Sequence, residues 1–333
     1  MLSRRSVLLL PVALKAGFIR SAFAGGFTDS AGRLVSLPGS VKRIIPAGPP
    51  AEALLYSLAP ETLLGLVEPW TDSQRKEAIP AARDLPNIPR VTRGEGALAI
   101  EAIKVFRPDL IIDYGAIDER YMVLADRVQS EVGIPYLLLD GRLAKVPEIV
   151  GRLGSILHRQ ERADLVAKTA ESVLRKLALL NSNAARGRVS VYYARGSDGM
   201  RAVRAGSSLS EAIELAGGRN VITSGEGAFS MMKVDDVAAL EPSVVVLADP
   251  KAAEIGSPLR KALSRETHFL VDPGLPYGWI ERPPSLNRLI GALWLASRLY
   301  PKEITFSADD ARMLNATLFH QVQTNLTIGQ ASQ

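Results

Sequence analysis

The hydrophobic and polar positions of the chain repeat one helix–strand unit in two places. At residues 100–112 an amphipathic helix is expected to end before Pro108 and to lead directly into a buried strand. The same order returns at 234–246, where Pro242 separates the helix from the strand. Proline disfavours helical geometry in the residue before it, so each helix must stop there. Short apolar runs between helices predict parallel strands that are buried on both faces.

A long helical stretch, broken near His158, separates the two units. We therefore predict an N-terminal α/β lobe at 25–158, a linker helix at 159–186 and a C-terminal α/β lobe with terminal helices at 187–333. The predicted fold class is α/β. It consists of two Rossmann-like lobes with mostly parallel central sheets, joined by one long rigid helix, with a ligand cleft between the lobes.

A strongly apolar helix is expected at 286–299, directly after a Pro-Pro pair. Ser285 is the expected N-cap of this helix, since a serine hydroxyl can accept a hydrogen bond from the first free backbone N–H groups. Asn287 and Arg288 either contact a ligand or tie the start of the helix to its own lobe, and we favour the second role.

Residues 1–24 predict an export signal. They combine a positively charged start, a short apolar run and the sequence Ala22-Phe23-Ala24, which suits a signal peptidase. Arg4 and Arg5 leave both a twin-arginine signal and an ordinary secretory signal open. The mature chain is expected to begin near Gly25 in the periplasm. It has no cysteine for a lipid anchor and no apolar stretch long enough to span a bilayer.

The charge of the chain lies largely in this signal. The whole chain has 40 basic and 35 acidic residues, and the signal contains four of the basic residues and no acid. The rest therefore has 36 basic against 35 acidic residues, a net charge of about +1. A nucleic-acid partner is not expected from such a balanced chain.

The residue types that usually perform chemistry are scarce. The chain has 3 histidines, which are widely separated, and no cysteine. A site for a bare metal ion built from imidazole or thiolate ligands is therefore not expected. The sequence contains neither a nucleophile elbow nor a phosphate-binding loop. We predict no catalytic residues, no resident cofactor and no enzyme activity.

Five segments occur in an order and spacing that is typical of one family. They are Asp29-Ser30-Ala31-Gly32-Arg33, Lys42-Arg43-Ile44-Ile45, Pro108-Asp109-Leu110-Ile111-Ile112, Gly133-Ile134-Pro135-Tyr136 and Ala216-Gly217-Gly218-Arg219-Asn220-Val221. Together they resemble the periplasmic binding proteins of ABC importers that carry iron-siderophores, haem and cobalamin. The resemblance extends from about residue 27 to residue 301. It implies a monomer that captures a small-molecule metal chelate and delivers it to an ABC transporter permease in the inner membrane.

The resemblance also implies that one acidic residue on each lobe docks on arginines of the permease. The residues that match are Glu101 and Asp235, the two acids of the repeated unit. Carboxylates on separate lobes would give a two-point, salt-sensitive attachment. Asp236 could replace Asp235 in this role, and alternatively both acids only favour the start of their helices.

The ligand-binding candidates lie in loops that are expected to follow strands, because such loops converge at a cleft in α/β folds. They are Gly48, Trp70, Tyr114, Arg195, Tyr277, Trp279 and Arg282. The rings could cover an apolar ligand face, and the guanidinium groups could bind carboxylate or oxyanion oxygens. This mixture favours a flat or bulky anionic complex. Each aromatic could equally be a core residue, and Arg282 could instead anchor the Pro-Pro turn.

Three functions remain open from the sequence. A carrier of a chelated metal, such as a ferric siderophore-like complex, haem or cobalamin, is the first. A carrier of an oxyanion such as molybdate or tungstate, built on the same fold, is the second. An exported α/β enzyme is the third, although the sequence nominates no residue for its chemistry.

Overall fold

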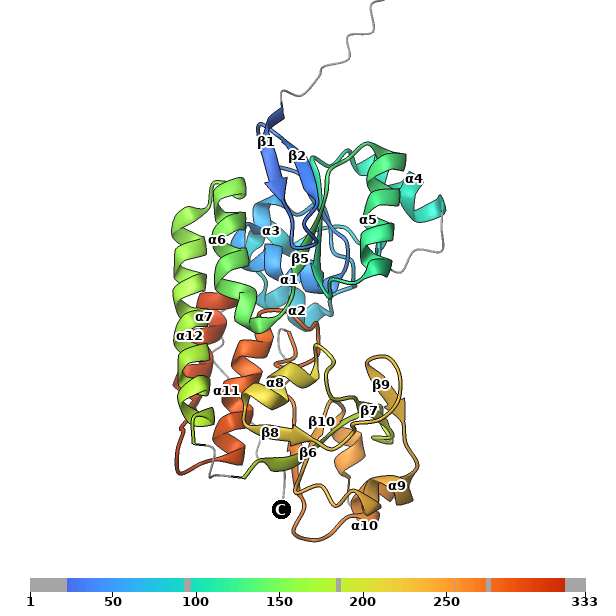
Figure 1. The fold of residues 1–333 in the computed structure, drawn as a ribbon, viewed down its shortest axis with the longest axis vertical. Helices are drawn as coiled ribbons and strands as arrows, with labels where there is room; N and C mark the ends of the chain where they lie inside the picture. The colour runs from blue at the N-terminus through green and yellow to red at the C-terminus, as the bar shows by residue number, and fades with distance from the viewer. Residues whose placement is uncertain (1–22, 93–96, 184–186, 255, 274–276, 321–333) are drawn as a thin grey trace, which may run out of the picture.

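The computed structural model of the protein describes residues 23–92, 97–183, 187–254, 256–273 and 277–320. Two α/β lobes lie one above the other in Figure 1, and the helix α7 (Gln160–Asn181) runs along one side of both. The predicted fold class is thus confirmed. The expected export signal lies outside the described residues, except for Phe23 and Ala24, which begin the first strand.

The N-terminal lobe contains a parallel sheet with the order β3-β4-β5 and a separate antiparallel hairpin, β1-β2. The strands are β1 (Phe23–Thr28), β2 (Leu34–Pro38), β3 (Ile44–Pro46), β4 (Leu110–Gly115) and β5 (Tyr136–Asp140). The helices are α1 (Pro49–Leu58), α2 (Asp72–Glu77), α3 (Pro80–Arg83), α4 (Ala97–Phe106), α5 (Glu119–Val132) and α6 (Val146–Leu157), with 3-10 turns η1 (Pro60–Thr62) and η2 (Leu143–Lys145).

The C-terminal lobe contains a mixed sheet with the order β11-β10-β6-β7-β9, in which β8 also pairs with β6. The strands are β6 (Val189–Arg195), β7 (Arg201–Val203), β8 (Gly218–Asn220), β9 (Phe229–Met231), β10 (Val244–Leu247) and β11 (His268–Val271). The helices are α8 (Ser210–Leu215), α9 (Val234–Ala239), α10 (Pro258–Ala262), α11 (Asn287–Leu299) and α12 (Ala308–Phe319), with the 3-10 turn η3 (Pro250–Ala253). The strands β8, β6, β10 and β11 are parallel to one another, whereas β7 is antiparallel to β6.

Both central sheets bury their two faces, as the apolar runs predict. In β4, Leu110 and Ile112 join one core cluster while Ile111 joins another on the opposite face. In β10, Val246 and Val245 divide between two clusters in the same way. Successive side chains of a strand point to opposite faces, so a strand covered on both sides needs an unbroken apolar run.

The repeated unit predicted from the sequence is present in both lobes. Helix α4 leads into β4, and helix α9 leads into β10. The residue before each proline, Arg107 or Glu241, has a left-handed φ of 46° or 43°. Each helix therefore ends through the same backbone conformation, even though a non-glycine residue rarely adopts it.

The helix α7 lies against both lobes rather than only connecting them. Its buried side chains, including Val166 and Leu177, belong to the same core cluster as Leu54 of the N-terminal lobe and Trp294 of α11. This cluster is continuous from one lobe to the other. A shared core of this kind stabilises one relative arrangement of the lobes, because parting them would expose its apolar surface.

The start of α11 differs from the prediction. Its N-cap residue is Leu286, and the apolar side chain of this residue makes no hydrogen bond to the backbone of the helix. The hydroxyl of Ser285 instead donates to the carbonyl oxygen of Pro50 in the other lobe, at 2.8 Å. The expected capping role of Ser285 is therefore wrong, because a contact between the lobes uses its hydroxyl group.

Candidate ligand-binding cleft

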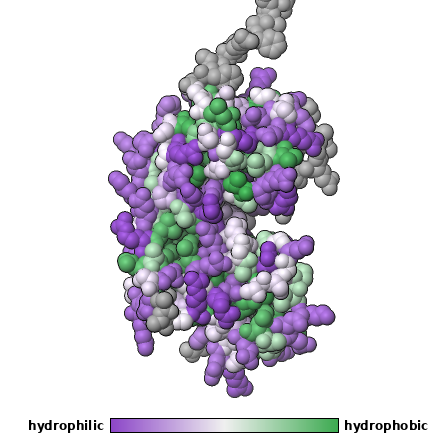
Figure 2. Space-filling model, viewed as in Figure 1, coloured by the Kyte–Doolittle hydropathy of each residue, from purple (hydrophilic) through white to green (hydrophobic). Residues whose placement is uncertain are grey.

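A cleft of about 790 Å³ lies between the two lobes. Figure 2 shows the surface hollowed on the side opposite α7, where the upper and lower lobes face each other. The N-terminal wall contains Ser30, Gly48, Pro50, Thr92, Asp113, Tyr114, Gly115, Ala116, Ile117, Tyr121, Asp140, Gly141 and Arg142. The C-terminal wall contains Gly206, Ser207, Ser208, Glu211, Glu214, Pro284 and Arg288.

The topology of the N-terminal sheet determines which residues form the N-terminal wall of the cleft. Strands β3, β4 and β5 are parallel, so their carboxyl ends meet at one edge of the sheet. Gly48 follows β3, Tyr114 lies at the end of β4 and Asp140 ends β5. A side chain at Gly48 would come within 2.9 Å of the hydroxyl of Thr92, so glycine allows these two cleft residues to approach closely.

A buried arginine joins the two lobes at the floor of the cleft. Arg288 of α11 is fully buried. It donates to Glu211 Oε2 at 2.8 Å and to the carbonyl oxygen of Ser208 in the C-terminal lobe. It also donates to the carbonyl oxygen of Gly141 in the N-terminal lobe. The other oxygen of Glu211 accepts a hydrogen bond from Leu143 N at 2.8 Å.

We call these five residues the Arg288 network. The network confirms that Arg288 ties the start of α11 to its own lobe, and it adds a bond to the other lobe that the sequence did not indicate. Asn287 bonds to the carbonyl oxygen of Gly278 in its own lobe. Five guanidinium N–H groups in a planar fork suit several carbonyl and carboxylate acceptors at once.

Two further carboxylates of the N-terminal wall differ in their environment. Asp113 is buried and accepts a hydrogen bond from the Tyr136 hydroxyl at 3.2 Å. Burial raises the pKa of Asp113 to about 6, so it is mostly ionised at neutral pH. Asp140 accepts a bond from Arg142 Nε at 2.8 Å. Although burial alone would raise the pKa of Asp140, its hydrogen bonds with Arg142 lower it.

The structure brings only two of the seven ligand-binding candidates, Gly48 and Tyr114, into this cleft. Trp70, Tyr277 and Arg282 line a second pocket of about 270 Å³. Pro50 and Pro284 line the cleft, and their sequence neighbours Pro49 and Pro283 line the second pocket. The two pockets are therefore adjacent. Pro50, whose carbonyl oxygen accepts the hydrogen bond from Ser285, lines the cleft.

The aromatic rings of the second pocket contact one another. The ring of Tyr277 lies edge-on to Tyr56 and Trp70, with centroids 5.9 and 6.1 Å apart. Glu52 accepts bonds there from Val67 N at 2.7 Å and from the indole of Trp70 at 3.0 Å. Burial raises the pKa of Glu52 to about 7. These aromatic contacts help to hold the lobes together at this second pocket.

Trp279 and Arg195 lie outside both pockets. Trp279 is a core residue with no exposed surface, and its ring lies edge-on to Trp294 and Phe306. Arg195 forms an ion pair with Glu281 and stacks on Phe229, with 4.4 Å from its guanidinium carbon to the ring centroid. Trp279 is therefore a core residue, which is the alternative that the sequence left open for each aromatic.

The two permease-docking candidates lie on different lobes. Glu101 belongs to α4 and Asp235 belongs to the first turn of α9, with its side chain exposed. Asp236 is exposed beside it. In Figure 1 both helices lie away from α7.

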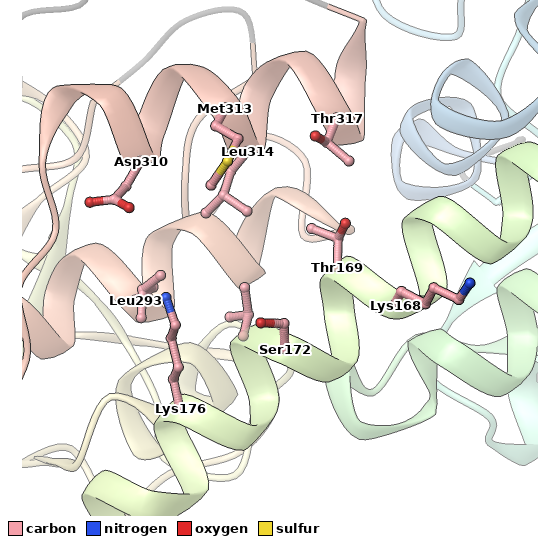
Figure 3. A pocket seen from close by; sticks show the side chains of 10 residues that line it. Lys168, Thr169, Ser172, Lys176, Leu293, Asp310, Met313, Leu314 and Thr317 are labelled. Atoms are coloured by element: carbon pink, nitrogen blue, oxygen red, sulfur yellow. The ribbon is translucent and has the colours of Figure 1, made fainter.

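A third hollow, of about 230 Å³, lies between helices on the outer face (Figure 3). Its residues come from α7, α11 and α12, and they include Ser172, Leu293 and Met313. Lys176 and Asp310 face each other across it. Among the described residues, the hollow has no lining residue in common with the cleft, and nothing in the structure shows what would cover it.

Two further properties concern the described residues only. Within those ranges no helix is both long and apolar enough to cross a membrane. Within the same ranges no three histidine, aspartate or glutamate side chains gather closely enough to hold a metal ion.

Two α/β lobes, a cleft walled by both and one long helix behind them define a two-lobe solute-binding protein. No family model and no curated protein matches the chain. An ABC transporter solute binding protein from Sulfurospirillum deleyianum is 25% identical over 90% of this chain and 96% of its own, with a TM-score of 0.80. The chain is thus similar in fold and in sequence to a solute-binding protein of an ABC transporter.

More distant structures share the fold. A molybdate periplasmic binding protein from Haemophilus influenzae is 15% identical over 90% of this chain and 99% of its own, with a TM-score of 0.65. A periplasmic vitamin B12 binding protein from Vibrio cholerae is 18% identical over 78% and 97%, with a TM-score of 0.58. All three of these neighbours are binding proteins for solutes.

Proposed function

We propose that this protein is the periplasmic solute-binding component of an ABC importer and that its solute is a chelated metal. It captures a complex such as a ferric siderophore-like chelate, haem or cobalamin and delivers it to a permease in the inner membrane. The observation that carries the proposal is the cleft of about 790 Å³ walled by both lobes. Pockets for drug-sized ligands have volumes of roughly 300–1,000 Å³.

The volume favours a chelate over the alternative of an oxyanion. A cleft of this size exceeds what a single tetrahedral oxyanion would fill, and such a small ligand would leave much of the wall uncovered. The polar groups of the cleft lie on both walls, so a ligand long enough to reach both would gain the most contacts. The proposed role consists of capture and delivery, with no bond of the solute made or broken.

A thermal-shift screen tests this function. The chain from residue 25 onward is expected to be stabilised by one ligand class in a panel of ferric siderophores, haem, cobalamin, nickel chelates and molybdate. A ligand at 100 times its Kd adds about 2.7 kcal/mol to the free energy of unfolding. The melting temperature should then rise by about 5 °C or more. A panel in which no compound raises the melting temperature, or in which the protein turns a compound over, would contradict the proposal.

Charge reversal tests the docking role of Glu101 and Asp235. The variants Glu101→Lys and Asp235→Lys should each bind the ligand found in the screen as the unchanged protein does. Their delivery of this ligand to vesicles containing the cognate permease should fall at least about tenfold, because a repulsive charge replaces an attractive one. Glu171→Lys, on the exposed face of α7, makes the same charge change away from both lobe tips and should deliver normally. Loss of ligand binding in the docking variants would refute the role.

A further inference from the structure

The charges of the cleft do not cancel. The described residues that line it include four carboxylates, those of Asp113, Asp140, Glu211 and Glu214, and two arginines. Arg142 bonds to Asp140 and Arg288 bonds to Glu211. Each of the two arginines is thus already paired with a carboxylate of the cleft.

Two carboxylates remain, one on each side of the cleft. Asp113 belongs to the N-terminal wall and Glu214 to the C-terminal wall. Among the described residues, neither has a lysine or arginine within ion-pair distance. Asp113 accepts a bond from a tyrosine hydroxyl, and Glu214 Oε1 accepts a bond from Ser210 Oγ at 3.0 Å. Neutral donors of this kind leave the negative charge in place. Asp113 is buried, where a charge without an opposite charge is costly, and Glu214 is half-buried.

A buried hydroxyl also lacks a partner in the cleft. Tyr114 is 1% exposed, and within the described part of the chain its hydroxyl makes no hydrogen bond. Buried polar atoms almost always have a partner in a complete protein structure. Tyr114 also lines the cleft, with its side chain on the face of β4 opposite to Asp113, and its neighbours would have to shift before a solute could supply this partner.

We infer that the cleft selects a metal complex of net positive charge, whose hydrogen-bond donors reach from Asp113 on one lobe to Glu214 on the other. This inference rests on the proposed function and narrows its ligand class. The Tyr114 hydroxyl, which has no partner within the described residues, forms a further hydrogen bond with the same complex once its neighbours shift. The expectation of an anionic complex depended on Arg195 and Arg282, and neither arginine lines this cleft.

Two inert cobalt(III) complexes of similar size and opposite charge test the inference. Tris(ethylenediamine)cobalt(III) is a cation that carries N–H donors, and tris(oxalato)cobaltate(III) is an anion that carries only acceptors. In calorimetric titrations at pH 7.5 and low salt, the protein should bind the cation at least about tenfold more tightly than the anion. Tighter binding of the anion, or binding of neither complex, would overturn the inference.

Single substitutions locate the binding. Asp113→Asn and Glu214→Gln should each weaken binding of the cationic complex about tenfold, the effect expected when a hydrogen bond to a charged group loses its charge. Tyr114→Phe should weaken it less. Glu171→Gln removes the same charge on the outer face of α7 and should bind normally. Unchanged binding in both folded cleft variants, as judged by circular dichroism, would overturn the inference.

The two proposals can fail separately. Stabilisation by an anionic chelate in the ligand screen, together with weak binding of the cationic cobalt complex, would overturn the inference and leave the transport function in place. A screen without any stabilising ligand would contradict the transport function itself.

Discussion

Replacing Arg288 with methionine is expected to lower the free energy of unfolding by about 3–5 kcal/mol. The guanidinium group is fully buried and donates to Glu211 and to carbonyl oxygens in both lobes. Methionine fills much of the same volume and supplies none of these donors. The carboxylate of Glu211 would remain half-buried with its charge uncompensated, and several backbone acceptors would lose their partner.

Urea denaturation followed by circular dichroism measures this loss. Arg288→Lys should be destabilised less than Arg288→Met, because it keeps the charge but not the planar fork of five donors. Arg120→Met is the matched control, since Arg120 forms an exposed ion pair with Asp118 on the surface, and it should leave stability nearly unchanged. An Arg288→Met protein with the stability of the unchanged chain would show that the network adds nothing to stability.

The network also bears on how the protein recognises a solute. Arg288 and Ser285, both at the start of α11, bond to backbone carbonyls of the N-terminal lobe. The aromatic contact of Tyr277 with Tyr56 and the core shared along α7 add to these bonds. Opening the cleft widely would break all of them together. We therefore expect a largely preformed cleft and a lobe movement of only a few degrees on binding.

The sequence predicts the architecture well because the architecture depends on local patterns. Proline after a helix and before an apolar run defines the α4-β4 and α9-β10 units, and both are present. The linker helix was expected at 159–186, and α7 occupies Gln160–Asn181. Each of these features can be recognised within about 20 neighbouring residues, from periodicity and proline alone.

The cleft depends on contacts between distant residues, which such patterns do not contain. Arg288 and Gly141 are 147 positions apart, and nothing near either residue indicates the other. Asp113 lies near the carboxyl end of β4 and Asp140 ends β5, and this position at a carboxyl edge is the signal in the sequence that points to them. Glu214 carries no such signal, because a glutamate on a short helix is usually solvated.

The site prediction is wrong for residues whose side chains have a suitable type but are already buried or paired within the protein. The sequence shows Trp279 as a ring in a loop, yet its backbone N–H donates to the buried Asp272 at 3.0 Å and its ring lies in the core. The sequence shows Arg195 as a charge, which Glu281 neutralises. A sequence lists donors and rings but does not show which are already engaged by the protein itself.

Replacing Gly291 with alanine is expected to destabilise the protein by about 1–3 kcal/mol. Gly291 lies within α11, where alanine would ordinarily be the better residue. A methyl group at this position would lie 2.7 Å from the carbonyl carbon of Trp279 and even closer to its oxygen. Backbone atoms cannot rotate away as a side chain can, so α11 and the loop of Trp279 would have to separate. Arg288 lies one turn before Gly291, so this shift would also disturb the Arg288 network.

Gly151 provides the matched control in α6. It also lies within a helix, but a methyl group there would meet no atom within 4 Å. Gly151→Ala should therefore stabilise the protein by up to about 1 kcal/mol, the difference in helix propensity between the two residues. Urea denaturation of the two variants compares the same chemical change with and without a neighbour. If Gly291→Ala matched Gly151→Ala, the close approach of α11 to Trp279 would be wrong. The position of Arg288 at the floor of the cleft would then lose its structural basis.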